Sequence, residues 1–125
     1  MTLEEPIFEL ELLGNTLVLV PRQDLSELQF IHFDSASQRV LEELDTTRAQ
    51  HLVIDLQNTN YYGSTALGFF VKLWKRIRCN HGNMAFCHLS DNEREVLKVT
   101  HLDGLWQVCD NRAEAIDYVE NAAQE

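Results

Sequence analysis

The sequence at the centre of the chain reads His51-Leu-Val-Ile-Asp-Leu56, followed by the polar loop 57–63 and by Ser64-Thr-Ala-Leu-Gly68. The first segment is apolar on both faces of an extended chain, which is typical of a central strand covered by helices. Helical spacing begins directly after the loop, on one face formed by Ala66, Phe70, Leu73, Trp74 and Ile77. A buried strand, a loop and an amphipathic helix therefore stand at the centre of the chain.

Upstream of this unit, the pattern predicts a hairpin and a helix. Ile7 to Leu13 alternates apolar and acidic residues, Gly14-Asn15 suits a turn, and Thr16 to Val20 is β-branched and apolar. Ser26-x-x-Gln29 is a capping box, which predicts a helix start. Its inward face would hold Phe33, Ala36, Val40, Leu41 and Leu44. The pattern leaves open whether this helix is continuous or is interrupted near Asp34-Ser35.

Downstream, two further strand–helix units are expected. Asn80-His-Gly82 ends the central helix, with Gly82 as the left-handed residue. Met84 to His88 and Leu105 to Val108 are short apolar strands. Ser90-x-x-Glu93 and Asn111-x-x-Glu114 are helix-capping patterns that follow them. The last helix would turn Ala115, Ile116 and Val119 inward.

The element order is therefore ββαβαβαβα. Strands that alternate with helices need crossover connections, which favour parallel pairing with helices packed on the sheet. The sequence predicts an α/β fold with a mixed, mostly parallel sheet of four to five strands covered by about four helices. A length of 125 residues suits a single domain that spans residues 1–125.

Charge and composition exclude several classes of function. The formal net charge is −10, and phosphate neutralisation needs a basic surface, so nucleic acid and anionic membranes are disfavoured as partners. We find neither a secretory leader nor an apolar run long enough to span a membrane, and we expect a cytoplasmic protein with reduced cysteines. Four of the ten basic residues form the run Lys72-x-x-Lys75-Arg76-x-Arg78, either a solvated helix face or a patch for an acidic partner or an anionic headgroup.

Motifs for enzymatic or metal chemistry are absent from the sequence. Cys79, His81, Cys87 and His88 lie close together in sequence, but their spacing fits no recognised zinc pattern. The chain has no Gly-x-Ser-x-Gly elbow, Walker loop or dinucleotide fingerprint. We therefore expect no enzyme activity, no metal site and no cofactor.

Candidate functional residues gather after the central strand, where sites of such sheets collect. Ser64 is expected to be the N-cap of the following helix, and the same helix end would stabilise a phosphate on Ser64 or Thr65. Tyr61 and Tyr62 are candidates for contact with a partner, although one of them could pack under the loop. Asp55 would hold the loop by hydrogen bonds or bind a cation of a partner. Asp24 is a solvated turn residue or lies near the same end of the sheet.

From Asp55 the chain reads Asp-Leu-Gln-Asn-Thr-Asn-Tyr-Tyr-Gly-Ser-Thr-Ala-Leu-Gly, which resembles the signature of the STAS family (sulfate transporter and anti-sigma factor antagonist). Family members have Asp-Leu after the central strand and Asp-Ser-Ser/Thr-Gly-Leu at the next helix start. Later segments are also similar, namely Leu73-Trp-Lys-Arg76, Arg94-Glu-Val-Leu97, Leu102-Asp103, Leu105-Trp106 and Glu114-Ala115. The resemblance covers about residues 6 to 121 and implies the STAS fold.

The resemblance also implies a function. In stand-alone members the serine after the Asp is the phosphoacceptor, which is Ser64 here, with Thr65 as the second choice. The unmodified protein would bind an anti-sigma factor that is also a serine kinase of the histidine-kinase-like ATPase type. Phosphorylation would break that complex, and a PP2C-type phosphatase would restore it. The implied partner-binding residues are Asp24, Asp55, Tyr61, Tyr62, Gly63, Ser64, Thr65 and Leu67.

Three features depart from the family pattern. Gly63 replaces the family Asp, Ala66 replaces the family Gly, and the segment from Asp24 to Asp34 is longer than usual. Because Gly63 removes a carboxylate beside the acceptor, a second interpretation stays open. The chain would then be a phosphorylation-independent binding module, as a subunit of a signalling complex or a partner of a lipid-transport ATPase.

Overall fold

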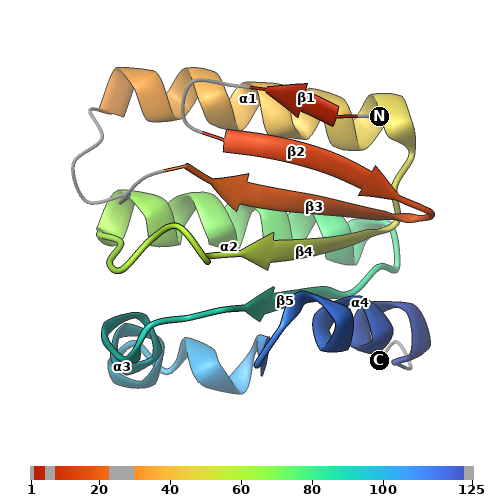
Figure 1. The fold of residues 1–125 in the computed structure, drawn as a ribbon. Coiled ribbons are helices and arrows are strands. Elements are labelled where there is room, and N and C mark those ends of the chain that lie inside the picture. The colour runs from red at the N-terminus through yellow and green to blue at the C-terminus, as the bar shows by residue number, and fades with distance from the viewer. Residues whose placement is uncertain (1, 5–7, 23–29, 123–125) are drawn as a thin grey trace.

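The computed structural model describes residues 2–4, 8–22 and 30–122 (Figure 1). Asp24 and the capping-box pattern at Ser26 and Gln29 lie outside the described residues. Their predicted roles therefore stay predictions.

One mixed sheet organises the described chain. Its six strands are β1 (Thr2–Glu4), β2 (Phe8–Leu13), β3 (Thr16–Pro21), β4 (His51–Asp55), β5 (Met84–Cys87) and β6 (Gln107–Cys109), and they lie side by side in that order. The pairs β1–β2 and β2–β3 are antiparallel, and the remaining three pairs are parallel. The predicted α/β fold with a mixed, mostly parallel sheet is confirmed. The sequence pattern missed β1 because three residues are too few to show alternation.

Helices cover both faces of the sheet. The described helices are α1 (Phe30–Thr47), α2 (Ser64–Cys79), α3 (Asp91–Val99) and α4 (Arg112–Asn121), with a short 3₁₀ turn at Leu102–Gly104. In Figure 1, α1 and α2 lie behind the sheet and α4 lies in front of it. The first helix is continuous through Asp34 and Ser35, which settles the alternative that the sequence left open. Within the part of the chain that the structure describes, no helix is long and apolar enough to cross a membrane.

Alternation along β4 separates two apolar layers. Leu52 and Ile54 belong to the large core under α1 and α2, whereas Val53 belongs to a smaller cluster under α4. All three side chains are fully buried. The double-sided burial predicted for this strand is confirmed, and it explains why both faces of the segment are apolar.

The turn after α2 differs from its prediction. The left-handed residue is His81, with φ of 60°, and not Gly82. Gly82 is nevertheless required, because an ideal Cβ there would overlap the carbonyl group of Gln50. The glycine therefore serves a close approach of two backbones rather than a positive φ.

The last strand also starts later than its pattern indicated. Leu102–Gly104 forms the 3₁₀ turn, and the backbone N–H of Trp106 donates to the carbonyl of Leu102, so β6 begins at Gln107. Trp106 is buried at 3% exposure and packs on Phe86 with ring centroids 5.0 Å apart, as expected of a core residue. Trp74 is only half-buried, and the Arg78 guanidinium lies 5.8 Å from its ring centroid.

Candidate functional site

The loop 57–63 carries the chain from the carboxyl end of β4 to the first residue of α2. Gly63 is the N-cap, with extended backbone angles, and its carbonyl accepts the first helical hydrogen bond from Leu67 N at 3.1 Å. Ser64 is therefore the first residue inside the helix and not the cap that the sequence predicted. Glycine is tolerated at an N-cap, so helical bonding begins one residue earlier than the serine indicated.

Two exposed hydroxyl groups stand at this helix start. Ser64 and Thr65 are exposed, and neither side chain makes a hydrogen bond to any described residue. The backbone N–H groups of Ser64, Thr65 and Ala66 precede the first helical bond, so they and the positive end of the helix favour a negative group here. The helix start is thus exposed and electrostatically suited to a negative group.

The two tyrosines before the helix have opposite environments. Tyr61 is 45% exposed, in keeping with a surface that contacts a partner. Tyr62 is fully buried, its hydroxyl donates to the backbone carbonyl of Glu93 at 2.8 Å, and its ring meets Phe70 edge to face. Tyr62 is therefore the tyrosine that packs under the loop, as the alternative for one of the two allowed, and its contact with a partner stays a prediction. Burial raises its pKa above the usual value near 10.

The start of α3 fastens the same loop. Glu93 is fully buried, and its carboxylate accepts from the Thr59 hydroxyl and from the Ser90 backbone N–H, the latter at 2.9 Å. The Ser90 hydroxyl donates to the carbonyl of Asn60 at 2.7 Å. The predicted capping box of α3 is confirmed, and its two side chains also hold the loop that leads to Ser64.

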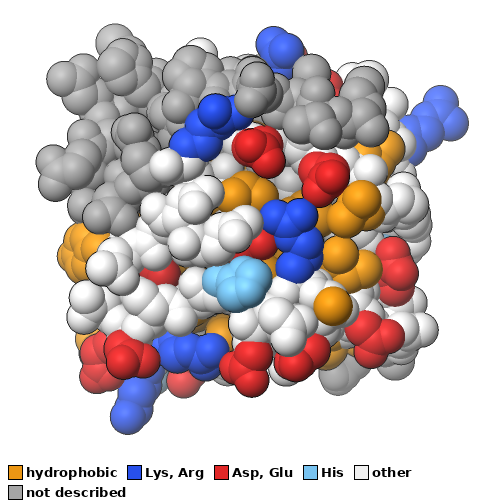
Figure 2. All heavy atoms as spheres, viewed as in Figure 1, with side chains coloured by type: hydrophobic (Ala, Val, Ile, Leu, Met, Phe, Trp, Pro, Cys, Tyr) orange, Lys and Arg blue, Asp and Glu red, His pale blue; other side chains and the backbone are white. Residues whose placement is uncertain are grey.

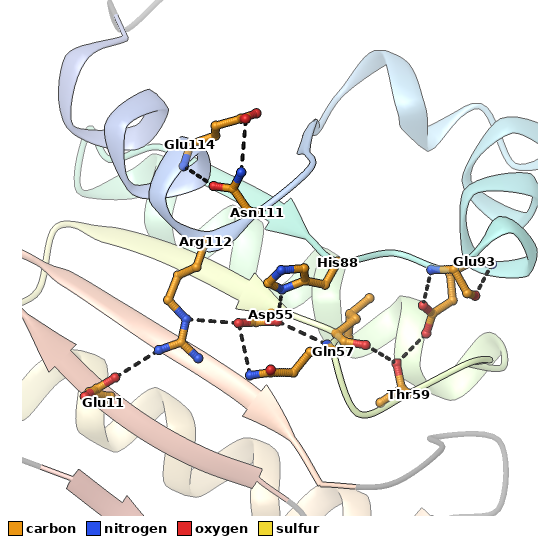
Figure 3. Close-up of polar contacts among 11 residues, drawn as sticks. Glu11, Asp55, Gln57, Thr59, His88, Glu93, Asn111, Arg112 and Glu114 are labelled. Atoms are coloured by element: carbon orange, nitrogen blue, oxygen red, sulfur yellow. Dashed lines mark hydrogen bonds and ion pairs between the residues drawn. The ribbon is translucent and has the colours of Figure 1, made fainter.

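Asp55 lies at the centre of a polar network (Figure 3). Its carboxylate accepts from Arg112 Nε at 2.9 Å and from the Gln57 backbone N–H at 3.1 Å, and it lies 2.8 Å from His88 Nδ1. The Arg112 Nη1 atom also donates to the Glu11 carboxylate, at 3.1 Å. The Asp55 side chain is only 1% exposed. Its bond to the Gln57 backbone agrees with a role in holding the loop, and its contact with a partner stays a prediction.

Asp55, Cys87 and His88 also bring three potential metal ligands within 4.8 Å of one another. However, hydrogen bonds already engage both carboxylate oxygens, and the Arg112 guanidinium opposes a second cation. Burial, followed by the nearby Asp55 carboxylate, raises the pKa of Cys87 to about 12, which disfavours a thiolate ligand. The arrangement is therefore explained as a network that ties α4 and β5 to the end of β4.

Sequence reasoning missed Arg112 and His88 as parts of this site. Arg112 is 57 positions from Asp55, and no local pattern links the two. His88 adopts φ of 59°, a left-handed conformation that is uncommon outside glycine and asparagine, and its side chain is 36% exposed. Glu93 carried a visible signal in the capping box, but its contact with Thr59 depends on the tertiary fold.

An exposed line of residues extends from Ser64 along α2. Gly68, Lys72 and Lys75 follow at helical spacing and are exposed, while Leu67 beside them is half-buried. Neither lysine has an ion-pair partner among the described residues. Arg76 pairs with Asp45 of α1. The basic run is thus mainly a solvated face, and two of its cations are available to a partner.

Face-on, the molecule shows a mixed surface. Figure 2 shows acidic and basic side chains interspersed with hydrophobic ones on the side that carries α4. On this face the acidic side chains therefore alternate with basic and hydrophobic ones and do not form a single acidic patch.

Comparison with known proteins identifies the family. The family model described as "STAS domain" matches residues 9–115. An anti-sigma F factor antagonist of Paenibacillus polymyxa is 24% identical over 94 residues, which cover 75% of this chain and 80% of that protein.

Solved structures agree with this match. A Thermotoga maritima protein assigned as an anti-sigma factor antagonist superposes with a TM-score of 0.81 at 21% identity, covering 93% of this chain and 97% of its own. The antagonist SpoIIAA in unphosphorylated form gives 0.74 at 18% identity, covering 94% and 99%. The phosphorylated Bacillus SpoIIAA gives 0.66 at 19%, covering 88% and 96%. At this identity the structures establish the fold, and with the family match they show that the chain belongs to the STAS domain family.

Proposed function

We propose that this chain is a non-enzymatic anti-sigma factor antagonist whose binding is switched by phosphorylation of Ser64. Its partner would be an anti-sigma factor with serine kinase activity of the histidine-kinase-like ATPase type. A PP2C-type phosphatase would reverse the modification. The observation that carries the proposal is the exposed Ser64 hydroxyl, which no described residue engages, at the first position of α2.

The electrostatics of the helix start support a local switch. A phosphate on Ser64 adds about −1.5 to −2 charges, and the free N–H groups of the first turn would stabilise it there. Against a net charge of −10, this addition changes the global field little. The phosphate would therefore disfavour docking where the partner touches the loop and helix end, through repulsion and the cost of desolvating it.

The surface beside Ser64 supports protein binding. Tyr61, Thr65 and the half-buried Leu67 lie within three residues of Ser64 along the chain, and tyrosine is enriched in interfaces. Gly68 follows one turn later, and a Cβ there would meet no atom within 4 Å. Glycine inside a helix costs up to about 1 kcal/mol relative to alanine. The open space at this glycine would let the backbone of a partner approach the helix closely.

One observation favours a second candidate, a binding subunit that is not phosphorylated. Gly63 is the N-cap, so the carboxylate of the family pattern is missing beside Ser64. A kinase that needs this carboxylate would not modify the chain. The protein would then bind constitutively to a signalling complex or to a lipid-transport ATPase.

A kinase assay separates the two candidates. The protein is incubated with ATP and each histidine-kinase-like ATPase of the source organism, and any added mass of about 80 Da is located by peptide mass spectrometry. We expect the phosphate on the peptide that contains Ser64, its loss in Ser64→Ala, and its retention in the matched control Thr65→Ala. Ser64→Asp should weaken the complex with the same kinase. If Ser64→Asp binds as tightly as wild type, the proposed switch is wrong, and a stable ATPase complex insensitive to Ser64 substitution supports the second candidate.

A further inference from the structure

The outer edge of β6 carries a surface that the proposed function does not use. β6 is the last strand of the described sheet, and no described strand pairs with its outer side. Backbone groups on such an edge are available to pair with another chain. We call the edge of β6, together with the adjoining ends of α3 and the 3₁₀ turn, the β6 edge surface.

Two hydrophobic side chains project from this surface. Val99 at the end of α3 is 69% exposed, and Leu105 after the 3₁₀ turn is 53% exposed. The other exposed large hydrophobic residues of the described chain, Leu13, Tyr61 and Tyr118, range from 37% to 45%. The two most exposed apolar side chains therefore belong to consecutive elements at one edge of the sheet.

A cavity of about 420 Å³ lies between α3 and β6, and the chain neighbours of the two side chains, Lys98 and Trp106, belong to its lining. Leu97, Trp106 and Val108 contribute apolar walls, and Arg94, Lys98 and Asp103 contribute charged groups. The Nε1–H of Trp106 is buried and has no acceptor among the described residues. A buried donor without an acceptor is uncommon in folded proteins, which indicates an incomplete environment at this place.

Side chains of both charges stand around the cavity, although the chain as a whole is acidic. Arg94 and Lys98 on α3 stand against Asp103 and Asp110 near β6, whereas the whole chain carries −10. The pair between Arg94 and Asp110 is long, at 3.5 Å, and exposed. Lys98 has no ion-pair partner among the described residues. At the lower left of Figure 2, over α3, basic and acidic side chains lie close together.

We infer that the β6 edge surface binds a second copy of this chain in a two-fold symmetric dimer. A two-fold interface must be self-complementary, and this surface offers both partners of each contact. Leu105 and Val99 of each copy would enter the cavity of the other, and β6 would lie beside β6. Lys98 and Arg94 of one copy would face Asp103 and Asp110 of the other. A different protein as partner would not require that one surface carry the protruding apolar side chains, the cavity that receives them and charges of both signs.

The self-association of the purified full chain tests this inference without any knowledge of Ser64 or its partner. Sedimentation velocity is measured from about 5 to 500 µM, since a dimer depends on concentration. We expect wild type to dimerise within this range. Leu105→Glu and Val99→Glu should weaken the dimer at least tenfold, while the matched controls Leu13→Glu and Tyr118→Glu should leave it unchanged.

Charge reversal refines the same experiment. Lys98→Asp should weaken the dimer, and the double variant Lys98→Asp with Asp103→Lys should restore it at least in part. The exposed positions of these residues allow all variants to fold, which circular dichroism checks. A wild type that stays monomeric at the highest concentration overturns the inference, and so does a dimer that the edge variants do not weaken.

Discussion

Two helices of this molecule start with a serine after a parallel strand, and the structure uses the two serines differently. At α3, the Ser90 hydroxyl accepts from Glu93 N at 3.1 Å and donates to Asn60 O at 2.7 Å. At α2, Gly63 is the cap, and no described residue bonds to the Ser64 hydroxyl. Both serines lie at the carboxyl end of the sheet, so position along the fold does not account for the difference.

This contrast distinguishes a serine that stabilises the loop from a serine whose hydroxyl is available for regulation. Ser90 and Glu93 hold the loop 57–63 in place by hydrogen bonds. Ser64 follows that loop, and its side chain makes none of the hydrogen bonds that hold it. A hydroxyl that the fold does not need can be modified without loss of structure. The comparison therefore favours Ser64 over Ser90 as the regulated residue, and three measurements test it.

The largest effect is expected from Glu93→Ala. This change leaves the Thr59 hydroxyl and the Ser90 N–H without their acceptor, and buried groups of this kind cost roughly 1–3 kcal/mol each. We expect a loss of about 3 kcal/mol in the free energy of unfolding, measured by urea denaturation. Glu95→Ala on the exposed side of the same helix is the control and should change stability by less than about 0.5 kcal/mol. Equal effects of the two substitutions would contradict the role of Glu93 as a clamp.

A smaller effect is expected from the serines themselves. Ser90→Ala removes an N-cap and a bond to the loop, so it should cost about 1–2 kcal/mol. Ser64→Ala should stay within about 0.5 kcal/mol of wild type, because no described group loses a hydrogen bond. Thermal unfolding of both variants under identical conditions provides the measurement. A Ser64→Ala variant as unstable as Ser90→Ala would remove the distinction on which the proposed switch depends.

The smallest effect concerns Tyr62, which links the loop to α3. Its pKa is raised in the folded state by burial, so the folded protein keeps the phenol proton that the unfolded chain releases above pH 10. The associated stability is complete below pH 10 and is lost as the pH rises above it. Between pH 9 and 10.5 this group alone should lower stability by about 0.8 kcal/mol.

Tyr62→Phe isolates this contribution. The variant should be about 1 kcal/mol less stable than wild type at pH 7, since it lacks the bond to Glu93 O, and it should lose less stability over the same alkaline range. Tyr61→Phe, at the exposed neighbour, should follow wild type throughout. A Tyr62→Phe variant whose stability falls as steeply as that of wild type between pH 9 and 10.5 would show that the phenol is not protected.

Local patterns predicted the elements well where their cause is local. The β2–β3 hairpin, the burial of β4 and the caps at Ser90 and Asn111 follow from alternation and from hydrogen bonds within three residues. The shift of the α2 cap from Ser64 to Gly63 and the late start of β6 arose where two local arrangements compete. The burial of Tyr62 could not be predicted from local patterns, because it depends on Glu93 and Phe70, which only folding brings near.

Local residue patterns account for the order of the elements from β2 to α4 and for the doubly buried central strand, and the family resemblance accounts for the choice of Ser64. Which polar side chains are engaged in hydrogen bonds across the molecule follows only from the tertiary structure. Asp55 is surrounded by Arg112, His88 and Gln57 from three parts of the chain, and Glu93 reaches back to Thr59 across 34 positions. The physical reason is that hydrogen bonds and burial depend on distance in space, whereas periodicity and capping depend only on distance along the chain.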